Sequence, residues 1–476
     1  MTGDDLSRPP AHGSTGSASS GAGPRAAIVG AGLSGSLLAL FLARRGYRVE
    51  VYEHRDDPRL SKDEGDGRSI NLGLSARGIR ALRRAGLLGE LWPHTVPMRG
   101  RMIHSPSGEL TFQPYGTADH EILYSIRRGV LNALLIEHAD ALDGVTFFYG
   151  LRCVDLDADT GTLTLSDTIS GETRRVEADL VVGADGAFSA VRRLMQRGRS
   201  ADLHQEFLEW GYKELTIPPA PDGGPRTPIE ALHLWPAHRA LIVAHPNTDN
   251  SLTCTLFLPH EGEPSFASLG SGAEAERFFR SRFPDTLRLI PGLAEEFEAN
   301  PVGRLVSVRT SAWHAGERVV LVGDACHAVY PFYGQGMNAS FEDCLVLDEC
   351  LARHPADRGA ALREYQDLRR PHTDVLAELS KENFLELRDG LRSPARLLRA
   401  RADLMLNRIF PRGWQPLYTM ISHTSMPYGE ALHRARRQNA LLGAAAGVLS
   451  AGTALGAAAA VLHLRRRAAG PARRTG

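Results

Sequence analysis

The chain has 476 residues, and its 55 lysines and arginines balance its 55 aspartates and glutamates, so the formal net charge is zero. A chain of this length exceeds the size at which one hydrophobic core keeps growing, so we expect at least two structural lobes. A neutral chain has no overall field to concentrate a polyanion, which argues against nucleic acid as a partner. The five cysteines include no C-x-x-C pair and no zinc-like spacing, so we expect free thiols, a reducing compartment and no metal.

The two ends of the chain differ from the middle. Residues 1–24 are rich in Gly, Ser, Ala and Pro without the apolar core of a secretory signal, which predicts a disordered lead-in. Residues 440–464 carry no Asp, Glu, Lys or Arg and are followed by Arg465, Arg466 and Arg467. This run is long enough to cross a bilayer but is mostly Ala and Gly, so a membrane span and a helix lying on the protein or at a surface both stay open. The expected location is the cytoplasm, with membrane association through the C-terminus left open.

The first predicted element after the lead-in is a β-α-β unit. It consists of a strand at Arg25–Gly30, a helical segment at Leu33–Arg45 and a second strand at Arg48–Glu53. The turn between the first strand and the helix reads Gly30-Ala31-Gly32-Leu33-Ser34-Gly35.

This glycine-rich turn predicts a dinucleotide site. Gly30 permits the tight turn, Gly32 lets the backbone approach a pyrophosphate, and Gly35 lets the helix pack closely on the sheet. Glu53 lies at the end of the second strand, where an acid accepts a hydrogen bond from an adenosine ribose. A structural turn is the alternative, and the fingerprint alone serves NAD and FAD alike.

Two later strands end in acidic glycine turns. The strand Leu180–Gly183 precedes Asp185, and the strand Arg318–Val322 precedes Asp324. These turns look like the Asp-Gly and Gly-Asp motifs of FAD-dependent aromatic hydroxylases, in the same order along the chain. In that family the acid of the second motif bonds the ribityl chain, which the resemblance assigns to Asp324. The alternative for either turn alone is that it merely ends a strand and binds no ligand.

The segment Pro331–Asn338 then opens a helical stretch that ends near Arg353. Gly334 and Gly336 at the helix start expose backbone N–H groups, and the positive end of the helix dipole can stabilise an anionic reduced flavin. An ordinary glycine-rich helix start is the alternative.

The remaining segments predict a second lobe and a helical region. From about Asp357 to Ala440 the pattern is helical, with breaks at Pro394 and Pro411. Between the two acidic turns the chain is β-rich and predicts a mainly antiparallel sheet that forms the substrate lobe. The strands are expected at Gly211–Ile217, Ile229–Trp235, Ala240–Ala244 and Ser251–Pro259, with a turn at His245–Asn250.

Five segments resemble the kynurenine 3-monooxygenase family, and the match extends from about Ala26 to Tyr428. The apolar tail also resembles the membrane-associating tail of eukaryotic members, apart from its richness in Ala and Gly. The five segments are Gly67–Leu72, Met98–His104, Gln113–Thr117, Glu214–Pro219 and Pro416–Met420.

The resemblance implies a reaction. NADPH reduces FAD, O2 adds at flavin C4a, and the resulting hydroperoxide transfers an oxygen to the ring carbon of L-kynurenine ortho to its amino group, giving 3-hydroxykynurenine. The electron-rich aniline ring is the nucleophile, so no catalytic Ser, Cys or metal is required. Protein groups orient the ring and exclude the water that would release peroxide. No second G-x-G-x-x-G unit is evident, so NADPH is expected to bind transiently, and its preference over NADH rests on the resemblance.

The resemblance also assigns binding residues. The amino-acid end of the substrate is expected near Arg101, Tyr115, Asn383 and Tyr418, where the planar fork of Arg101 can hold a carboxylate in an apolar cavity. One register error would exchange Arg127 for Arg128 in the cofactor set. The FAD contacts carried over are Leu33, Val51, Tyr52, Glu53, His54, Gly73, Arg127, Asp324, Met337 and Asn338.

Three other functions stay open. They are a related flavin hydroxylase of another anthranilate-like or phenolic acid, a nicotinamide-only dehydrogenase, and a non-enzymatic flavin-binding or membrane-tethered protein. The oligomeric state is undetermined.

The predicted fold class is α/β, with a Rossmann-type FAD-binding domain, a mainly antiparallel substrate lobe and a C-terminal helical region. The FAD-binding domain is expected in residues 25–90, 120–200 and 302–355, and the substrate lobe in 91–119 and 201–301. The helical region is expected in 356–439, and the apolar helix with its basic tail in 440–476.

Overall fold

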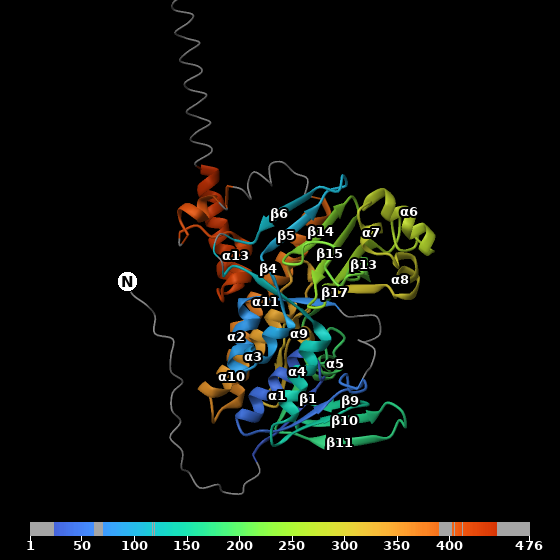
Figure 1. Ribbon diagram of the computed structural model, residues 1–476. Helices are drawn as coiled ribbons and strands as arrows, with labels where there is room; N and C mark the ends of the chain where they lie inside the picture. The colour runs from blue at the N-terminus through green and yellow to red at the C-terminus, as the bar shows by residue number, and fades with distance from the viewer. Residues whose placement is uncertain are drawn as a thin grey trace, which may run out of the picture.

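The computed structural model describes residues 23–60, 70–116, 118, 120–389, 402–403, 405–411 and 413–444. Nearly all of the predicted lead-in, the break at Pro394 and the tail beyond residue 444 lie outside these residues. The chain forms a lower and an upper lobe (Figure 1), and helix α11 (Arg358–Asp389) contacts elements of both. Among the helices of the described part, none is long and apolar enough to cross a membrane.

The lower lobe is built on a six-stranded sheet of order β18-β19-β12-β1-β2-β8. All neighbours are parallel except the pair β18–β19 at one edge. Strand β12 is buried along its whole length, as expected of a parallel strand covered on both faces. The four strands predicted for this domain are confirmed. The bounds are β1 Arg25–Val29, β2 Arg48–Tyr52, β8 Val145–Phe148, β12 Leu180–Gly183, β18 His314–Ala315 and β19 Val319–Leu321.

Helices cover this sheet. Helix α1 (Leu33–Arg44) packs against β1, β2 and three further helices, and its side chains from Leu37 to Leu42 are all buried. A helix that is apolar on every side is one that is enclosed by protein, which explains its sequence. The other helices of the lobe are α2 Ala76–Ala85, α3 Leu88–Leu91, η1 Trp92–His94, α4 Arg128–Asp140, α5 Ala190–Met195, α9 Asp324–His327, η2 Pro331–Tyr333 and α10 Gly336–Arg353.

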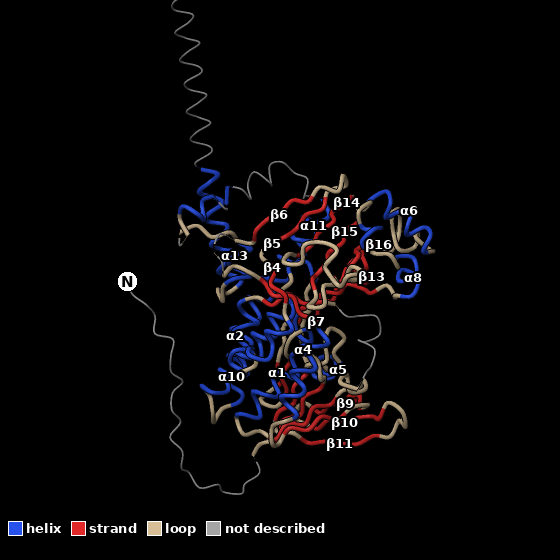
Figure 2. Tube along the Cα trace, in the orientation of Figure 1, coloured by secondary structure: helices blue, strands red, loops and turns tan. Residues whose placement is uncertain are grey.

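Two small antiparallel sheets complete the lower lobe, and the sequence analysis predicted neither. The sheet β11-β10-β9 forms a separate layer at the bottom of the lobe, seen in Figure 2. The sheet β3-β7-β4 lies where the two lobes meet. The bounds are β9 Leu151–Asp157, β10 Thr162–Asp167, β11 Thr173–Glu177, β3 Asn71–Leu74, β7 Leu123–Arg127 and β4 Val96–Met98.

The upper lobe is a seven-stranded sheet of order β17-β13-β16-β15-β14-β5-β6. Every neighbouring pair is antiparallel except β14–β5, so the mainly antiparallel lobe is confirmed. Helices α6 (Gly272–Arg282), α7 (Thr286–Leu289) and α8 (Leu293–Ala299) pack on one face. The strands are β5 Gly100–His104, β6 Leu110–Pro114, β13 Leu203–Ile217, β14 Leu232–Ala237, β15 Ala240–Pro246, β16 Leu252–Pro259 and β17 Gly303–Thr310.

Two strands belong to a different sheet from the one that the expected domain division assigns to them. Strand β17 falls in the stretch 302–355 that was expected in the FAD-binding domain, yet it pairs with β13 of the upper sheet. Strand β4 falls in the stretch 91–119 that was expected in the substrate lobe, yet it pairs with β7. The physical reason is that an alternating pattern identifies a strand but not its partner.

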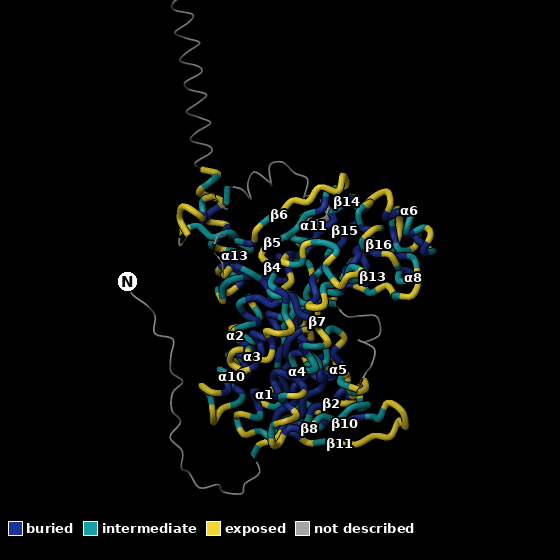
Figure 3. Tube along the Cα trace, viewed as in Figure 1, coloured by how far each residue is buried: buried dark blue, intermediate teal, exposed yellow. Residues whose placement is uncertain are grey.

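The C-terminal region is helical, as predicted. Helix α11 continues through Pro371, and it is followed by α13 (Leu417–His423) and a helical stretch at residues 428–444. Leu376 and Leu379 of α11 pack with Met420, Ile421 and Tyr428. Figure 3 shows that burial is densest around the centre of the lower lobe, while the surface of the C-terminal region is more exposed.

A buried ion network joins this region to the lower lobe. Arg369 on α11 donates to Glu342 at 2.5 Å and to Asp343 at 2.7 Å, both on α10. Arg77 on α2 donates to Glu342 at 2.8 Å, and its guanidinium lies 4.0 Å from the ring centroid of Tyr428. The network therefore ties three helices and the start of the last described helical stretch together.

Candidate active site

The glycine-rich turn after β1 has the geometry that a pyrophosphate site needs. Gly30 has a φ of +106°, and a Cβ there would lie 2.5 Å from the carbonyl oxygen of Ala184. A Cβ at Gly35 would lie 2.0 Å from the carbonyl oxygen of Gly30, so α1 can approach the turn only with glycine. A Cβ at Gly32 would meet no protein atom within 4 Å, so this glycine faces open space.

Glu53 lies beside this turn, at the end of β2. Its Oε2 accepts a hydrogen bond of 3.0 Å from the N–H of Ala31, and its Oε1 lies 2.9 Å from Nε of Arg55 and 2.9 Å from Nδ1 of His54. Although burial opposes ionisation, the bonds from Arg55 hold the pKa of Glu53 below its ordinary value. The acid is thus charged and fixed next to the turn, where an adenosine ribose would reach it.

Most of the other residues assigned to FAD near this turn have buried side chains, so their backbone atoms are what they can offer the cofactor. Val51 and Tyr52 are buried in the core, as is Leu33 at the start of α1. The His54 side chain is half exposed. Arg55, which holds Glu53, was not singled out from the sequence, although its place two residues after the strand-end acid could have drawn attention to it.

Asp324 opens α9 directly after β19. Its side chain is open to solvent on one side, although the three residues after it are buried. The protein atoms around the carboxyl partly desolvate it and raise its pKa, and the charges of His327 and Arg128 oppose that rise in part. Within the described part of the chain no hydrogen-bond donor is recorded for this carboxylate, so its oxygens can accept from ribityl hydroxyls.

Asp185 has a different role. Its carboxylate accepts from Ser189 Oγ at 2.5 Å, from the N–H of Ala190 at 2.7 Å and from the N–H of Val191 at 3.1 Å. The side chain therefore caps α5, and a contact with the cofactor from this segment would come from the neighbouring backbone.

The start of α10 is held by Asn338. Its Oδ1 accepts from the N–H of Ser75 at 2.9 Å, and its Nδ2 donates to the carbonyls of Gly73 and Gly334 at 2.9 and 3.0 Å. The side chain is committed to the protein, so the N–H groups at Gly336, Met337 and Asn338 are what this helix can offer a flavin. Gly334 has a φ of +66°, which sets the turn before the helix.

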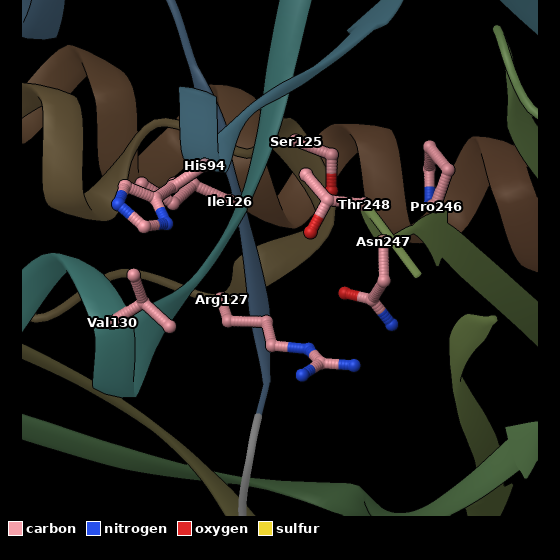
Figure 4. Close-up of a pocket in the computed structure, with 8 residues that line it drawn as sticks. All are labelled: His94, Ser125, Ile126, Arg127, Val130, Pro246, Asn247 and Thr248. Carbon is pink, nitrogen blue, oxygen red and sulfur yellow. The ribbon is translucent and has the colours of Figure 1, made fainter. Parts of the chain in front are cut away.

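Arg127 ends β7 and extends into a pocket of about 180 Å³, drawn in Figure 4. Its Nη2 lies 2.6 Å from Oδ2 of Asp249. Arg128, the alternative, is exposed and is the arginine whose charge acts on Asp324. The pocket is also lined by His94, Ser125, Ile126, Val130, Pro246, Asn247 and Thr248.

A larger cavity of about 450 Å³ lies between the upper lobe and the C-terminal region, and it collects all four predicted substrate residues. Arg101 comes from β5, Tyr115 follows β6, Asn383 comes from α11 and Tyr418 from α13. Asn383 Nδ2 donates to the carbonyl of Phe332 at 2.7 Å. Residues far apart in the sequence thus face one space.

Arg101 is the partly buried cation that lines this cavity. Its guanidinium carbon lies 4.5 Å from the ring centroid of Tyr418 and 5.8 Å from that of Tyr115. Although burial opposes the charge, the neighbouring phenol groups hold the pKa of Arg101 above its ordinary value. The hydroxyl of Tyr115 is buried without a hydrogen-bond partner among the described residues, so it can donate to a ligand.

Several residues of the cavity were not identified from the sequence. Thr419 has a buried Oγ1 without a partner among the described residues, and Tyr333 belongs to η2 just before α10. Glu382 and Glu386 lie on α11. Thr419 and Tyr333 fall inside segments that were recognised, whereas the two glutamates follow from the helical period around Asn383. The other lining residues are Gln113, Pro114, Leu379, Asp403, Pro416, Leu417, Ala435, Gln438 and Asn439.

One group of described residues has the spacing of metal ligands, namely Cys326, His327 and Asp343. Asp343 already accepts from Arg369 Nε at 2.7 Å and from the N–H of Gly323 at 3.1 Å, and it also bonds His327. Because an arginine balances this carboxylate, we interpret the group as part of the buried ion network.

Residues 25–380 match the family described as FAD binding domain. The fold and the dinucleotide turn thus define a flavoprotein of this family. The chain belongs, more narrowly, to the kynurenine 3-monooxygenase family. It is 54% identical to the kynurenine 3-monooxygenase of Salinispora tropica, over 94% of this chain and 98% of the relative. The enzyme of the same name from Myxococcus xanthus is 44% identical over 84% of this chain and 86% of the relative. The resemblance noted in the sequence is confirmed.

Solved structures share the fold. A 2-methyl-3-hydroxypyridine-5-carboxylic acid oxygenase has a TM-score of 0.65 at 23% identity, covering 81% of this chain and 98% of that one. PqsL, a probable FAD-dependent monooxygenase from Pseudomonas aeruginosa, has a TM-score of 0.61 at 22% identity, covering 78% of this chain and 98% of that one.

Proposed function

We propose that this chain hydroxylates the aromatic ring of L-kynurenine next to its amino group, with FAD as cofactor and NADPH and O2 as co-substrates. The observation that carries this proposal is the convergence of Arg101, Tyr115, Asn383 and Tyr418 on one cavity. Family membership supplies the reaction class, because relatives at 54% and 44% identity carry the kynurenine 3-monooxygenase name.

The cavity carries both charges that an α-amino acid requires. Arg101 is the cation for a carboxylate, and the unsatisfied hydroxyl of Tyr115 can add a hydrogen bond. Glu382 and Glu386 line the same space and suit an ammonium group. A simple phenolic acid would use Arg101 but has no ammonium group to meet the negative charge on this wall of the cavity, which favours the amino acid.

The cavity also adjoins the segment assigned to the flavin. Tyr333 lines it, Gly334 follows directly, and Gly336 is the first residue of α10. Bound FAD supplies the redox chemistry that activates O2 after reduction by a nicotinamide nucleotide. The chain itself holds the cofactor at the turn after β1, Glu53 and Asp324, fixes the amino-acid end of the substrate, and excludes water.

The test uses the purified flavoprotein. NADPH oxidation should accelerate when L-kynurenine is added, and mass spectrometry should show a product heavier by one oxygen atom. Anthranilate and a kynurenine analogue without the α-amino group serve as matched ligands, and NADH replaces NADPH in a parallel series. Equal turnover of anthranilate and L-kynurenine would favour the related hydroxylase, and flavin without any substrate-stimulated oxidation would contradict both.

We also propose that residues 440–464 attach the chain to a membrane surface. Leu441, at the start of this segment, and Met405, Ile409 and Phe410 of the C-terminal region are exposed large apolar side chains. Flotation with anionic and neutral lipid vesicles, comparing the full chain with one that ends at Asn439, tests the proposal. Equal flotation of the two proteins contradicts it.

A further inference from the structure

A chain of buried hydrogen bonds crosses the upper lobe on the sheet face opposite Arg101. It begins at Asp285, the N-cap residue of α7, whose Oδ2 lies 2.7 Å from Nδ1 of His104 on β5. His104 Nε2 lies 2.8 Å from Nδ1 of His233 on β14, and His233 Nε2 lies 2.6 Å from the carbonyl oxygen of Pro228. The two histidines are 3% and 0% exposed, so the protein alone must satisfy their nitrogens.

We call Asp285, His104 and His233 the relay. The directions of their hydrogen bonds fix how many protons the three side chains hold together. A carbonyl can only accept, so His233 Nε2 must carry a hydrogen. If His233 is neutral, its Nδ1 accepts, and His104 Nε2 must donate to it. Because the carboxylate of Asp285 accepts from Nδ1, His104 then carries hydrogens on both ring nitrogens. Any other arrangement that keeps all three hydrogen bonds contains the same number of protons. That number is one more than the number held by two neutral imidazoles and an ionised carboxylate.

The surroundings favour His104 as the charged member. Its ring stacks on the indole of Trp235, with the centroids 3.8 Å apart, and Trp235 Nε1 donates to Asp285 Oδ2 at 2.9 Å. A cation over an indole is favourable. Burial lowers the pKa of His233 to about 4, so that ring is neutral. Although burial opposes it, the bonds from His104 and Trp235 keep the pKa of Asp285 below its ordinary value.

Among the described residues, no other charged group affects the protonation of His233. The charged groups that act on it are His104 and Asp285. On the flanking chain, Arg226 donates to main-chain carbonyls, including that of Arg288 on α7 at 3.3 Å.

The relay lies where the sheet is least supported. The hairpin β5–β6 joins the rest of the sheet through β14, with the register pairs Arg101↔Leu232, Met102↔His233 and Ile103↔Leu234. Strand β6 is the edge and is mostly exposed. This hairpin holds Arg101 and leads directly into Tyr115, so its placement sets the carboxylate end of the cavity.

We infer that Asp285, His104 and His233 share one buried proton, and that His104 is a positioning residue that braces the hairpin of Arg101 and Tyr115. The effect on substrate rests on the proposed function, whereas the buried proton does not. The relay is complete while the proton is held. As the pH rises and the proton leaves, two acceptor nitrogens face each other and the brace is lost.

The proton is tested by nuclear magnetic resonance on the holoprotein with ¹⁵N-labelled histidine. The signals that disappear in His104→Phe identify His104, and at neutral pH both of its ring nitrogens should be protonated. In Asp285→Asn, which removes the counter-charge at nearly constant shape, the same signals should show a smaller fraction of doubly protonated ring than the wild type shows at the same pH. One unprotonated ring nitrogen in the wild type, at a pH where the protein is folded, overturns the inference.

The brace is tested by hydrogen exchange and substrate affinity at one fixed pH. In Asp285→Asn the amides of residues 100–114 should exchange about ten-fold faster, and the Kd for L-kynurenine should rise about ten-fold, the scale of one lost hydrogen bond. FAD occupancy should not change, and Asp285→Glu should recover part of the loss. The matched control is His354→Phe, because His354 forms a partly exposed pair with Glu364 at 2.7 Å, away from the hairpin.

The outcomes separate the positioning role of His104 from the proposed function. Unchanged exchange in residues 100–114 together with unchanged substrate affinity overturns the positioning role. If the wild type does not bind L-kynurenine at all, the proposed function fails, while the resonance and exchange results still decide the inference. Should His104→Phe fold poorly, Asp285→Asn provides the same comparison.

Discussion

The guanidinium of Arg101 lies over the ring of Tyr418, with its Cζ atom 4.5 Å from the ring centroid. One residue belongs to β5, next to the edge strand of the upper sheet, and the other to the C-terminal helix α13, so the contact closes the cavity between them. A guanidinium stacked on an aromatic ring keeps its N–H groups in plane and free to bind a carboxylate.

Replacing Arg101 by Ala should therefore weaken substrate binding. Truncating one member of a desolvated charge pair costs about 2–5 kcal/mol, so the Kd for L-kynurenine should rise by about one and a half to three and a half powers of ten. Titration of the flavin spectrum measures it. An analogue without the carboxylate should bind the wild type poorly, and the substitution should lower its affinity little further. Arg99→Ala, on the same hairpin but exposed, is the control. Unaltered binding in Arg101→Ala would refute the substrate orientation.

Replacing Asp324 by Ala should lower FAD retention. Its carboxylate is the acceptor expected to meet the ribityl hydroxyls, and a lost partner at such a position costs about 1–3 kcal/mol. The variant should purify paler, and the ratio of flavin to protein absorbance measures the loss. Asp324→Asn, which keeps an acceptor oxygen, should lose less. Full flavin occupancy with wild-type affinity in Asp324→Ala contradicts the assignment.

The three glycines of the turn after β1 should respond differently to alanine. Gly35→Ala places a Cβ 2.0 Å from a carbonyl oxygen and should impair folding. Gly32→Ala meets no protein atom within 4 Å, so it should fold normally yet bind FAD more weakly, because the added methyl occupies the space left for the pyrophosphate. Thermal unfolding and flavin content separate the two effects. Gly89→Ala, also in open space and on α3, is the control. Equal flavin affinity in Gly32→Ala and Gly89→Ala would rule out this pyrophosphate position.

Replacing Arg369 by Met should destabilise the protein by about 3–5 kcal/mol, because it removes the buried cation that Glu342 and Asp343 share. Denaturant unfolding measures the change. The matched control is Arg80→Met, since the exposed pair Arg80–Glu349 should contribute less than about 1 kcal/mol. Similar losses in the two variants would show that the network does not stabilise the fold.

The same network predicts a pH dependence. Although burial opposes ionisation, His327 and Arg369 hold the pKa of Asp343 below its ordinary value. Its stabilising contribution should therefore be complete above the unfolded carboxyl pKa, about 3.9, and be lost as the pH falls through the lower folded value. Unfolding free energies measured from neutral pH downward should fall more steeply in the wild type than in Asp343→Asn. Parallel curves would contradict this.

Truncation after Asn439 should leave FAD binding intact, because every cofactor motif lies upstream. The cavity residues Gln438 and Asn439 are retained, so substrate binding should also persist. Truncation after Ser425 removes Tyr428, which covers Arg77, and should destabilise the protein. Flavin content and thermal unfolding of the two proteins provide the measurement. Loss of flavin in the shorter deletion would show that the tail is part of the fold.

The sequence by itself determined the features that depend on neighbouring residues. The turn from Gly30 to Gly35 was predictable because a positive φ and a close backbone approach are local demands that glycine meets. The strands of the lower sheet were predictable because buried parallel strands are continuous apolar runs. The family was recognisable because its motifs are short and contiguous.

The tertiary structure decided what depends on partners distant in the chain. It placed β17 beside β13, set Asn338 to hold a helix start, and added Glu382 and Glu386 to the cavity. The relay of Asp285, His104 and His233 has no sequence signature, because its members come from three separate elements. A residue's type states which bonds it can make, but only the packing of the elements decides which partner it meets, and burial decides what that bond is worth.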